Sequence, residues 1–144
     1  MSNSVLVAVD GSDGGKRALE YASERAKLGG AKLIVTYVIE WSPYSFNTPE
    51  ENAERHMRRE QEIERATSGV VDPAAAVLKA AGIEHETVVR HGPPAETLIK
   101  LAEKHGVQQI VIGRRGQSGI KNLLFGSVAG TLVQTSPVPV VVVP

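Results

Sequence analysis

A glycine-rich, cationic stretch, GRRGQSGIKNLLFGS, occupies residues 113–127 and directly follows the apolar run at 109–112. It holds four glycines and three cationic side chains. Glycine lets the backbone turn tightly and exposes N–H groups without side-chain obstruction. Exposed backbone N–H groups and positively charged side chains at the end of a strand favour a phosphate ligand. The alternative interpretation is a surface loop whose glycines serve turns only.

A second candidate group, Asp10-Gly11-Ser12, follows the first apolar run of the chain at 5–9. A carboxylate repels phosphate but accepts hydrogen bonds from a ribose hydroxyl or from the amino group of a nucleobase. The other role open to Asp10 is the N-cap of the next helix, a position for which Ser12 or Asp13 is better placed. Asp10 is therefore a candidate for the uncharged part of a nucleotide.

Gly126 and Ser127 lie where a final helical segment, SVAGTLVQTS, begins. The first turn of a helix presents unpaired N–H groups and about half a positive charge, and both favour an anion. Charge-assisted hydrogen bonds contribute roughly 1.5–3 kcal/mol each, so three or four aligned donors suffice for a polyphosphate. We expect at most one of Arg114, Arg115 and Lys121 to be essential, because loop cations are usually solvated.

Five segments have the composition of β-strands, namely 5–9, 33–39, 84–90, 109–112 and 138–143. The first, second and fourth are almost continuous in Val, Ile and Leu, as in parallel strands covered on both faces. Helical patterns alternate with them, with apolar residues three and four positions apart. This alternation predicts one α/β domain over residues 1–144, with a doubly wound, Rossmann-like parallel sheet and helices on both faces.

The order of the strands follows from the two that are least suited to the centre of such a sheet. The third is polar, and the fifth carries Pro139, which cannot donate a ladder hydrogen bond. With both at the edges, the predicted order is 3-2-1-4-5. Ligands of open α/β sheets bind beyond the carboxyl ends of the strands where the order reverses. Asp10 and Gly113, at the ends of the first and fourth strands, are therefore expected to meet at one crevice.

The stretch from Thr48 to Ala81 is the least regular part of the sequence. Gly69, Asp72 and Pro73 interrupt two helix-favouring runs, and proline inside a helix costs about 3 kcal/mol. We expect a break or kink near residues 69–73, with Asp72 as N-cap and Pro73 at the first helical position. The segment 41–47, with its proline, is predicted to be a mobile loop.

Composition excludes several classes of function. Sixteen Lys and Arg balance sixteen Asp and Glu, which favours neither nucleic acid nor an anionic membrane surface. The absence of cysteine excludes disulfides, thiolate catalysis and Cys-based zinc sites and favours the reducing cytoplasm. The apolar run near the N-terminus is too short for a signal sequence or a membrane span. The four histidines show no metal-ligand spacing and are expected at the surface, although His91 could approach a ligand from its strand end.

Gly113, Gly116, Gly126 and Ser127 fit the pattern G-x2-G-x9-G-[ST]. With the VAVDGS start and the VPVVVVP end, they make essentially the whole chain resemble the universal stress protein family, in its ATP-binding branch. One feature departs from the family pattern: the second helix is interrupted near residues 69–73, whereas in the family it is usually unbroken. The resemblance implies an adenine flanked by the backbone near Ala8 and Val38, with Asp10 on the ribose or the base. The implied nucleotide-binding residues are Ala8, Val9, Asp10, Val38, Gly113, Arg114, Arg115, Gly116, Gly126, Ser127 and Val128.

The expected ligand is ATP, with AMP as the other possibility, and Mg²⁺ or Mn²⁺ is expected to bridge the phosphates. An apolar edge strand at Val138–Val143 favours pairing with a second copy, and the resemblance implies the same homodimer. The sequence thus predicts a non-enzymatic stress-response module whose nucleotide occupancy is read by a partner protein. The alternative is a slow ATPase or an adenylyl-transferring enzyme. A phosphorylatable receiver domain is excluded, because Arg90-His91 stands where its acceptor Asp would be.

Overall fold

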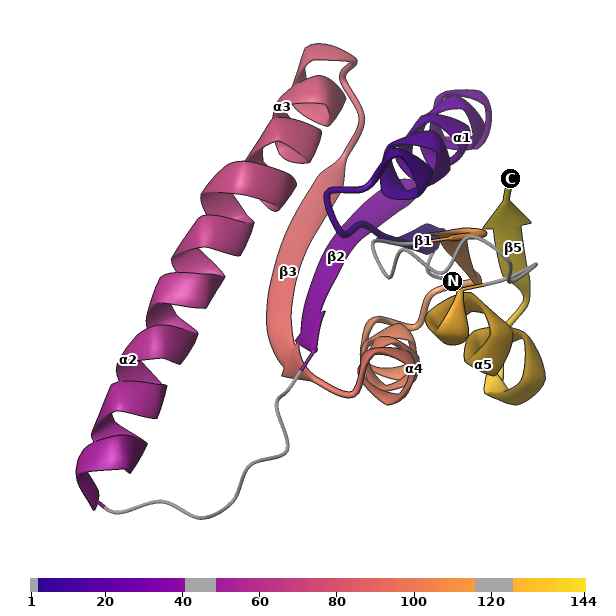
Figure 1. Ribbon diagram of the computed structural model, residues 1–144. Helices are drawn as coiled ribbons and strands as arrows, with labels where there is room; N and C mark the ends of the chain where they lie inside the picture. Colours follow the sequence, from indigo (N-terminus) through magenta and orange to yellow (C-terminus); the bar gives the residue numbers. More distant parts are fainter. Residues whose placement is uncertain (1–2, 41–48, 116–125) are drawn as a thin grey trace.

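The computed structural model describes residues 3–40, 49–115 and 126–144 (Figure 1). The expected loop at 41–47, Gly116 and Lys121 lie outside these ranges. The elements alternate along the chain as predicted. They are β1 (Ser4–Ala8), α1 (Asp13–Gly29), β2 (Lys32–Glu40), α2 (Pro49–Ala66), a π-helical turn (Thr67–Val71), α3 (Asp72–Ala80), β3 (His85–Gly92), α4 (Pro94–His105), β4 (Gln109–Gly113), α5 (Ser127–Thr135) and β5 (Val140–Val143).

The sheet has the predicted order β3-β2-β1-β4-β5, and every neighbouring pair is parallel. The polar strand β3 and the proline-led strand β5 are the two edges, as expected. Pro139 lies just before β5, where its carbonyl accepts a hydrogen bond from the Ile110 N–H at 3.0 Å. The strand begins at Val140, two residues later than the predicted start at 138, because Pro139 has no N–H for the ladder.

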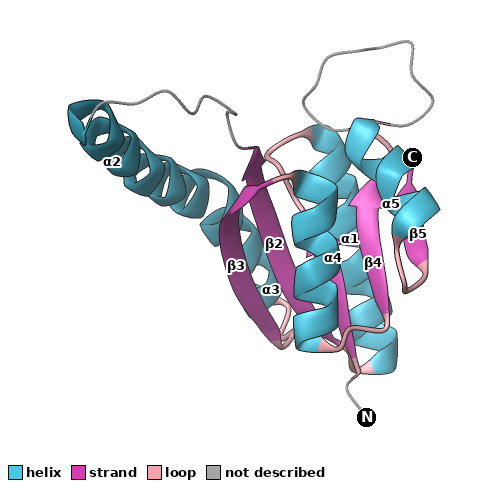
Figure 2. Cartoon of the chain, turned by 90° about the horizontal axis from the view of Figure 1, so that it is seen from below, coloured by secondary structure: helices cyan, strands magenta, loops and turns pink. Residues whose placement is uncertain are grey.

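Two hydrophobic layers cover the two faces of the sheet, which explains the nearly continuous apolar strands (Figures 1 and 2). Side chains alternate along β1, so that Val5 and Val7 face α1 and α3 while Leu6 faces α4 and α5. Apolar helix residues spaced three and four positions apart, the pattern seen in the sequence, lie in these layers. Leu19, Ala22 and Ala26 of α1 are buried in the first, and Leu98 and Ala102 of α4 in the second.

The segment between α2 and α3 differs from the prediction. No N-cap forms at Asp72, whose φ and ψ are helical, and the chain runs from α2 into α3 through the π-helical turn. The Asp72 N–H donates to the Thr67 carbonyl five residues back. Pro73 lacks an N–H and its ring would clash with the carbonyl four residues back, so the wider turn admits proline without ending the helix.

Helix α2 projects beyond the sheet, and its carboxyl-terminal part packs near β2 and β3 (Figure 2). His91 on β3 and Glu62 on α2 are joined by a 2.8 Å contact between Nε2 and Oε2. The His91 side chain is only 12% exposed, so this histidine is more buried than the sequence predicted. Among the helices of the described ranges, none is both long enough and apolar enough to cross a membrane.

Candidate functional site

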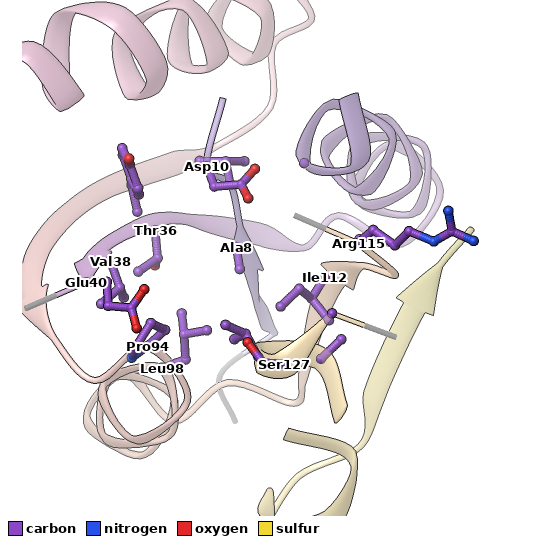
Figure 3. Close-up of a pocket in the computed structure, with 17 residues that line it drawn as sticks. Ala8, Asp10, Thr36, Val38, Glu40, Pro94, Leu98, Ile112, Arg115 and Ser127 are labelled. Carbon is purple, nitrogen blue, oxygen red and sulfur yellow. The ribbon is translucent and has the colours of Figure 1, made fainter. Parts of the chain in front are cut away.

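A cavity of about 320 Å³ opens beyond the carboxyl ends of β1, β2 and β4 (Figure 3). This is the edge at which the strand order reverses, because β1 lies between β2 and β4. Asp10, Gly113 and Ser127 all line the cavity, although they are far apart in sequence. The predicted convergence of the first and fourth strands on one crevice is therefore confirmed.

Asp10 follows β1 and lies at the start of α1. Its Oδ1 accepts hydrogen bonds from the Ser12 N–H at 3.0 Å and from the Ser12 hydroxyl. Ser12 in turn caps α1, since its Oγ accepts from the Gly15 N–H at 3.2 Å. Ser12, and not Asp10, is thus the N-cap. The Asp10 carboxylate is held in place by this turn while it lines the cavity.

Gly113, the last residue of β4, lies against Gly14 in the first turn of α1. A methyl group at Gly113 would lie 2.5 Å from the Gly14 carbonyl oxygen and 3.0 Å from its Cα. A methyl group at Gly14 would overlap the carbonyl oxygen of Arg115. These two glycines let α1 approach the end of β4 closely, so Gly113 has a packing role besides the turn role read from the sequence. The consecutive Gly14-Gly15 at the start of α1 was the available signal for this contact.

The amino terminus of α5 forms another side of the cavity. Gly126 is its N-cap and has no side chain to accept the helix's N–H groups. The Gly126 N–H itself donates to the Arg114 carbonyl at 2.6 Å, so this amide is already used. The first N–H groups of a helix have no acceptor within it. Ser127, Val128 and Ala129, which all line the cavity, contribute these amides.

The two arginines of the motif lie differently from the other predicted residues. Arg115 lines the cavity, but Figure 3 shows its guanidinium directed away from it. Arg114 is absent from the lining, and its backbone N–H donates to the Val143 carbonyl in β5 at 2.7 Å. Around the amino terminus of α5, the described donors for a phosphate are therefore backbone amides and the Ser127 hydroxyl. Gly116, also predicted for the site, lies outside the described residues.

Ala8, Val9 and Val38, which were predicted for the nucleotide site, line the cavity, but much of its apolar wall was not foreseen. Pro94 and Leu98 come from the first turns of α4, and Ile112 comes from β4. The alternation of β2 places Thr36, Val38 and Glu40 on the face that carries α4. The period of two in β2 could have indicated Thr36 and Glu40, whereas the contribution of α4 depends on how that helix crosses the sheet. The residues that complete the lining are Gly15, Tyr37 and Ala129.

Tyr37 lies between this cavity and a smaller groove of about 240 Å³ beneath α2, because it lines both. Burial raises the pKa of the Tyr37 phenol, and the carboxylates of Asp10 and then Glu62 raise it further. A raised pKa in the folded state means that the folded protein keeps this proton at pH values where the unfolded chain has lost it.

We expect the free energy of unfolding to fall as the pH rises above about 10, the ordinary pKa of tyrosine. The contribution from Tyr37 is fully present below that pH and is lost as the pH passes its folded pKa. Urea unfolding between neutral and strongly alkaline pH measures it. In Tyr37→Phe the free energy of unfolding should fall less between neutral and alkaline pH than in the wild type. In the control Tyr21→Phe, on α1, it should fall as much as in the wild type. An equal fall in the free energy of unfolding in both variants would show that Tyr37 is not its source.

No group of three or more His, Cys, Asp or Glu side chains that could hold a metal ion occurs within 3–40, 49–115 and 126–144. The polar groups of the cavity are two carboxylates, the hydroxyls of Thr36, Tyr37 and Ser127, and backbone amides, a set that suits a nucleotide better than a metal bound by protein alone.

Comparison with known proteins identifies the family of the chain and shows the same fold in solved structures. The model of the universal stress protein family matches residues 1–144. The universal stress protein YxiE of Bacillus subtilis is 32% identical over 156 residues, which cover 99% of each chain. The solved structure of the hypothetical protein MJ0577 superposes with a TM-score of 0.81 at 25% identity, over 99% of this chain and 96% of the other.

A universal stress protein solved in complex with cAMP is also similar, with a TM-score of 0.64 and 28% identity over 99% of this chain and 96% of the other. The family match spans the chain from end to end, and the sheet order and the helices that flank the sheet agree with the similar solved structures. This chain belongs to the universal stress protein family.

Proposed function

We propose that this protein binds an adenine nucleotide, ATP or AMP, in the cavity beyond β1 and β4 and acts as a regulatory module in a stress response. The observation that carries the proposal is the meeting of two unlike groups in one cavity. The Asp10 carboxylate offers acceptors on one side, and the amino terminus of α5 offers N–H donors on another. A nucleoside phosphate carries both ribose hydroxyl donors and an anionic group, so it could use both sides of the cavity.

The apolar wall supports the same ligand. Val38, Leu98 and Ile112 line the cavity with aliphatic side chains that suit the faces of a planar base. The base is proposed to lie against this wall, near the backbone of Ala8 and Val38, with the ribose at Asp10. The phosphates are proposed to lie near Gly113 and Gly126, with the amides of Ser127 and Val128 as the donors. The related structure in complex with cAMP adds support for an adenine base.

A divalent cation is proposed to accompany a triphosphate. Mg²⁺ and Mn²⁺ take oxygen ligands, keep several waters and commonly bind through phosphates with few protein ligands. In the described residues, the backbone amides of α5 supply donors only, so the phosphates would provide most of the oxygen ligands. The metal would screen the charge of the phosphates near Asp10.

We propose a homodimer formed through β5. Its four valines, Val140–Val143, are all partly exposed, and the strand pairs with β4 on one side only. An apolar edge of this kind is a template for a second strand, and a two-fold partner would cover it. Sedimentation at twice the monomer mass of 15.4 kDa would support the dimer, and a monomer at all concentrations would exclude it.

The proposed role is binding and not turnover. The cysteine-free composition fits a cytoplasmic protein, and a partner that reads the nucleotide-bound state would complete the signalling role. At most weak ATP hydrolysis is expected, because Ser127 has no neighbouring base in the sequence to activate it.

Isothermal titration calorimetry with ATP, AMP and adenosine tests the proposal. We expect micromolar dissociation constants for the two nucleotides, with ATP measured in the presence and absence of Mg²⁺. Adenosine should bind at least about tenfold more weakly, because it lacks the phosphate that the α5 amides would hold. Absence of binding for all three, or equal affinity for adenosine and AMP, would contradict the proposed site.

A further inference from the structure

Glu40 is the last residue of β2 and lies at the rim of the cavity. Figure 3 shows Thr36, Val38 and Glu40 in succession along the cavity wall. Across the ladder, Glu40 is paired with Gly92, which has no side chain to cover the carboxylate. The carboxylate makes no hydrogen bond or ion pair with any residue of the described ranges. Within 3–40, 49–115 and 126–144, this acceptor at the cavity therefore has no matching donor.

The surroundings of Glu40 show which part of a ligand it would meet. Figure 3 groups it with Val38, Pro94 and Leu98 on one side of the cavity, and Ile112 and Arg115 lie on the other. Pro94 and Leu98 are apolar, and Leu98 is buried. A phosphate group gains nothing on this side, because the carboxylate repels it. A flat base is favoured on this side, because the aliphatic side chains cover its faces and the Glu40 carboxylate can accept a hydrogen bond from its polar edge.

We propose that Glu40 determines base specificity by accepting a hydrogen bond from an exocyclic amino group of the bound base. An ionised carboxylate has acceptor oxygens only, so it favours an amino group and disfavours a carbonyl oxygen at the same position. The N6 amino group is the feature that distinguishes adenine from a purine without a substituent at C6. This inference rests on the proposed nucleotide site and assigns the selection of its base to one side chain.

The expected size of the effect follows from the exposure of Glu40. A hydrogen bond to a charged group in a fully buried site would discriminate more strongly, but Glu40 lies at the open rim and is exposed. We therefore expect discrimination of about tenfold in the dissociation constant. Because Glu40 is exposed at a strand end, its substitution should leave the fold intact, which circular dichroism and thermal unfolding can verify.

The test compares AMP with purine riboside 5′-monophosphate, which carries hydrogen in place of the amino group. Isothermal titration calorimetry on the full chain should give wild-type affinity about tenfold higher for AMP. In Glu40→Ala this ratio should fall close to one, and in Glu40→Gln it should be intermediate, because a neutral amide accepts a weaker bond. Glu96→Gln, in the first turn of α4 but outside the lining, is the matched control and should keep the wild-type ratio.

The outcomes separate this inference from the proposed function. If the wild-type protein binds both nucleotides and Glu40→Ala keeps the wild-type ratio, the site stands and the role of Glu40 is wrong. If the wild-type protein binds both equally well, no group selects the amino substituent and the inference is likewise overturned. If neither nucleotide binds, the proposed function itself fails, and the inference fails with it.

Discussion

Gly14→Ala is expected to lower the free energy of unfolding by about 1–3 kcal/mol, the usual cost of forcing an extra carbon into a packed interior. The added methyl group would overlap the Arg115 carbonyl oxygen and would also lie 3.4 Å from the Arg115 carbonyl carbon. These neighbours are backbone atoms, which cannot rotate away as a flexible side chain would. Relief requires α1 to move from the end of β4, at the edge of the cavity.

Urea unfolding of Gly14→Ala and Gly29→Ala measures this effect with a control in the same helix. A methyl group at Gly29 would have nothing within 4 Å, so that variant should keep or gain stability, by up to about 1 kcal/mol. Gly14→Ala should also bind nucleotide more weakly, because the displaced backbone of Arg115 lines the cavity. Equal stability of the two variants would show that α1 does not approach β4 as closely as described.

Asp10→Asn is expected to weaken nucleotide binding by about 10- to 100-fold, with a much smaller effect on stability. A hydrogen bond to a charged acceptor contributes about 1.5–3 kcal/mol, and 1.4 kcal/mol corresponds to a tenfold change in affinity. Asparagine keeps one side-chain oxygen, which can still accept from the Ser12 N–H and hydroxyl as Oδ1 of Asp10 does. The turn into α1 is therefore preserved, while the charge offered to the ribose is lost.

Asp13→Asn provides the matched control for Asp10→Asn. Asp13 lies in the first turn of α1 and is absent from the cavity lining. Its neutralisation removes a favourable interaction with the helix dipole, which costs about 0.3–1 kcal/mol of stability, but should leave the dissociation constant unchanged. If Asp10→Asn bound nucleotide as tightly as Asp13→Asn, Asp10 would have no role in binding.

The sheet could be predicted from the sequence because its order depends on local properties of two strands. The polar residues of β3 and Pro139 before β5 excluded both from the centre, and this left β1 and β4 as neighbours. The position of the cavity then followed from topology, since ligands of such sheets bind where the order reverses. Asp10 and Gly113 could be brought together on that basis alone.

The features that sequence reasoning missed depend on distances between elements. The contact between Gly14 and Gly113 joins residues about one hundred positions apart, and its closeness depends on how α1 lies across the sheet. The wall formed by Pro94 and Leu98 depends in the same way on α4. The π-helical turn before Asp72 was missed because a proline can be accommodated by widening a helix as well as by ending it.

Crystals grown with saturating AMP would test most directly whether the cavity beyond β1 and β4 is an adenine nucleotide site. We expect the base beside Val38 and Leu98, a ribose hydroxyl within hydrogen-bond distance of the Asp10 carboxylate, and the phosphate at the Ser127 and Val128 amides. An empty cavity at saturating nucleotide, or a nucleotide bound elsewhere with Asp10 uninvolved, would contradict the proposal.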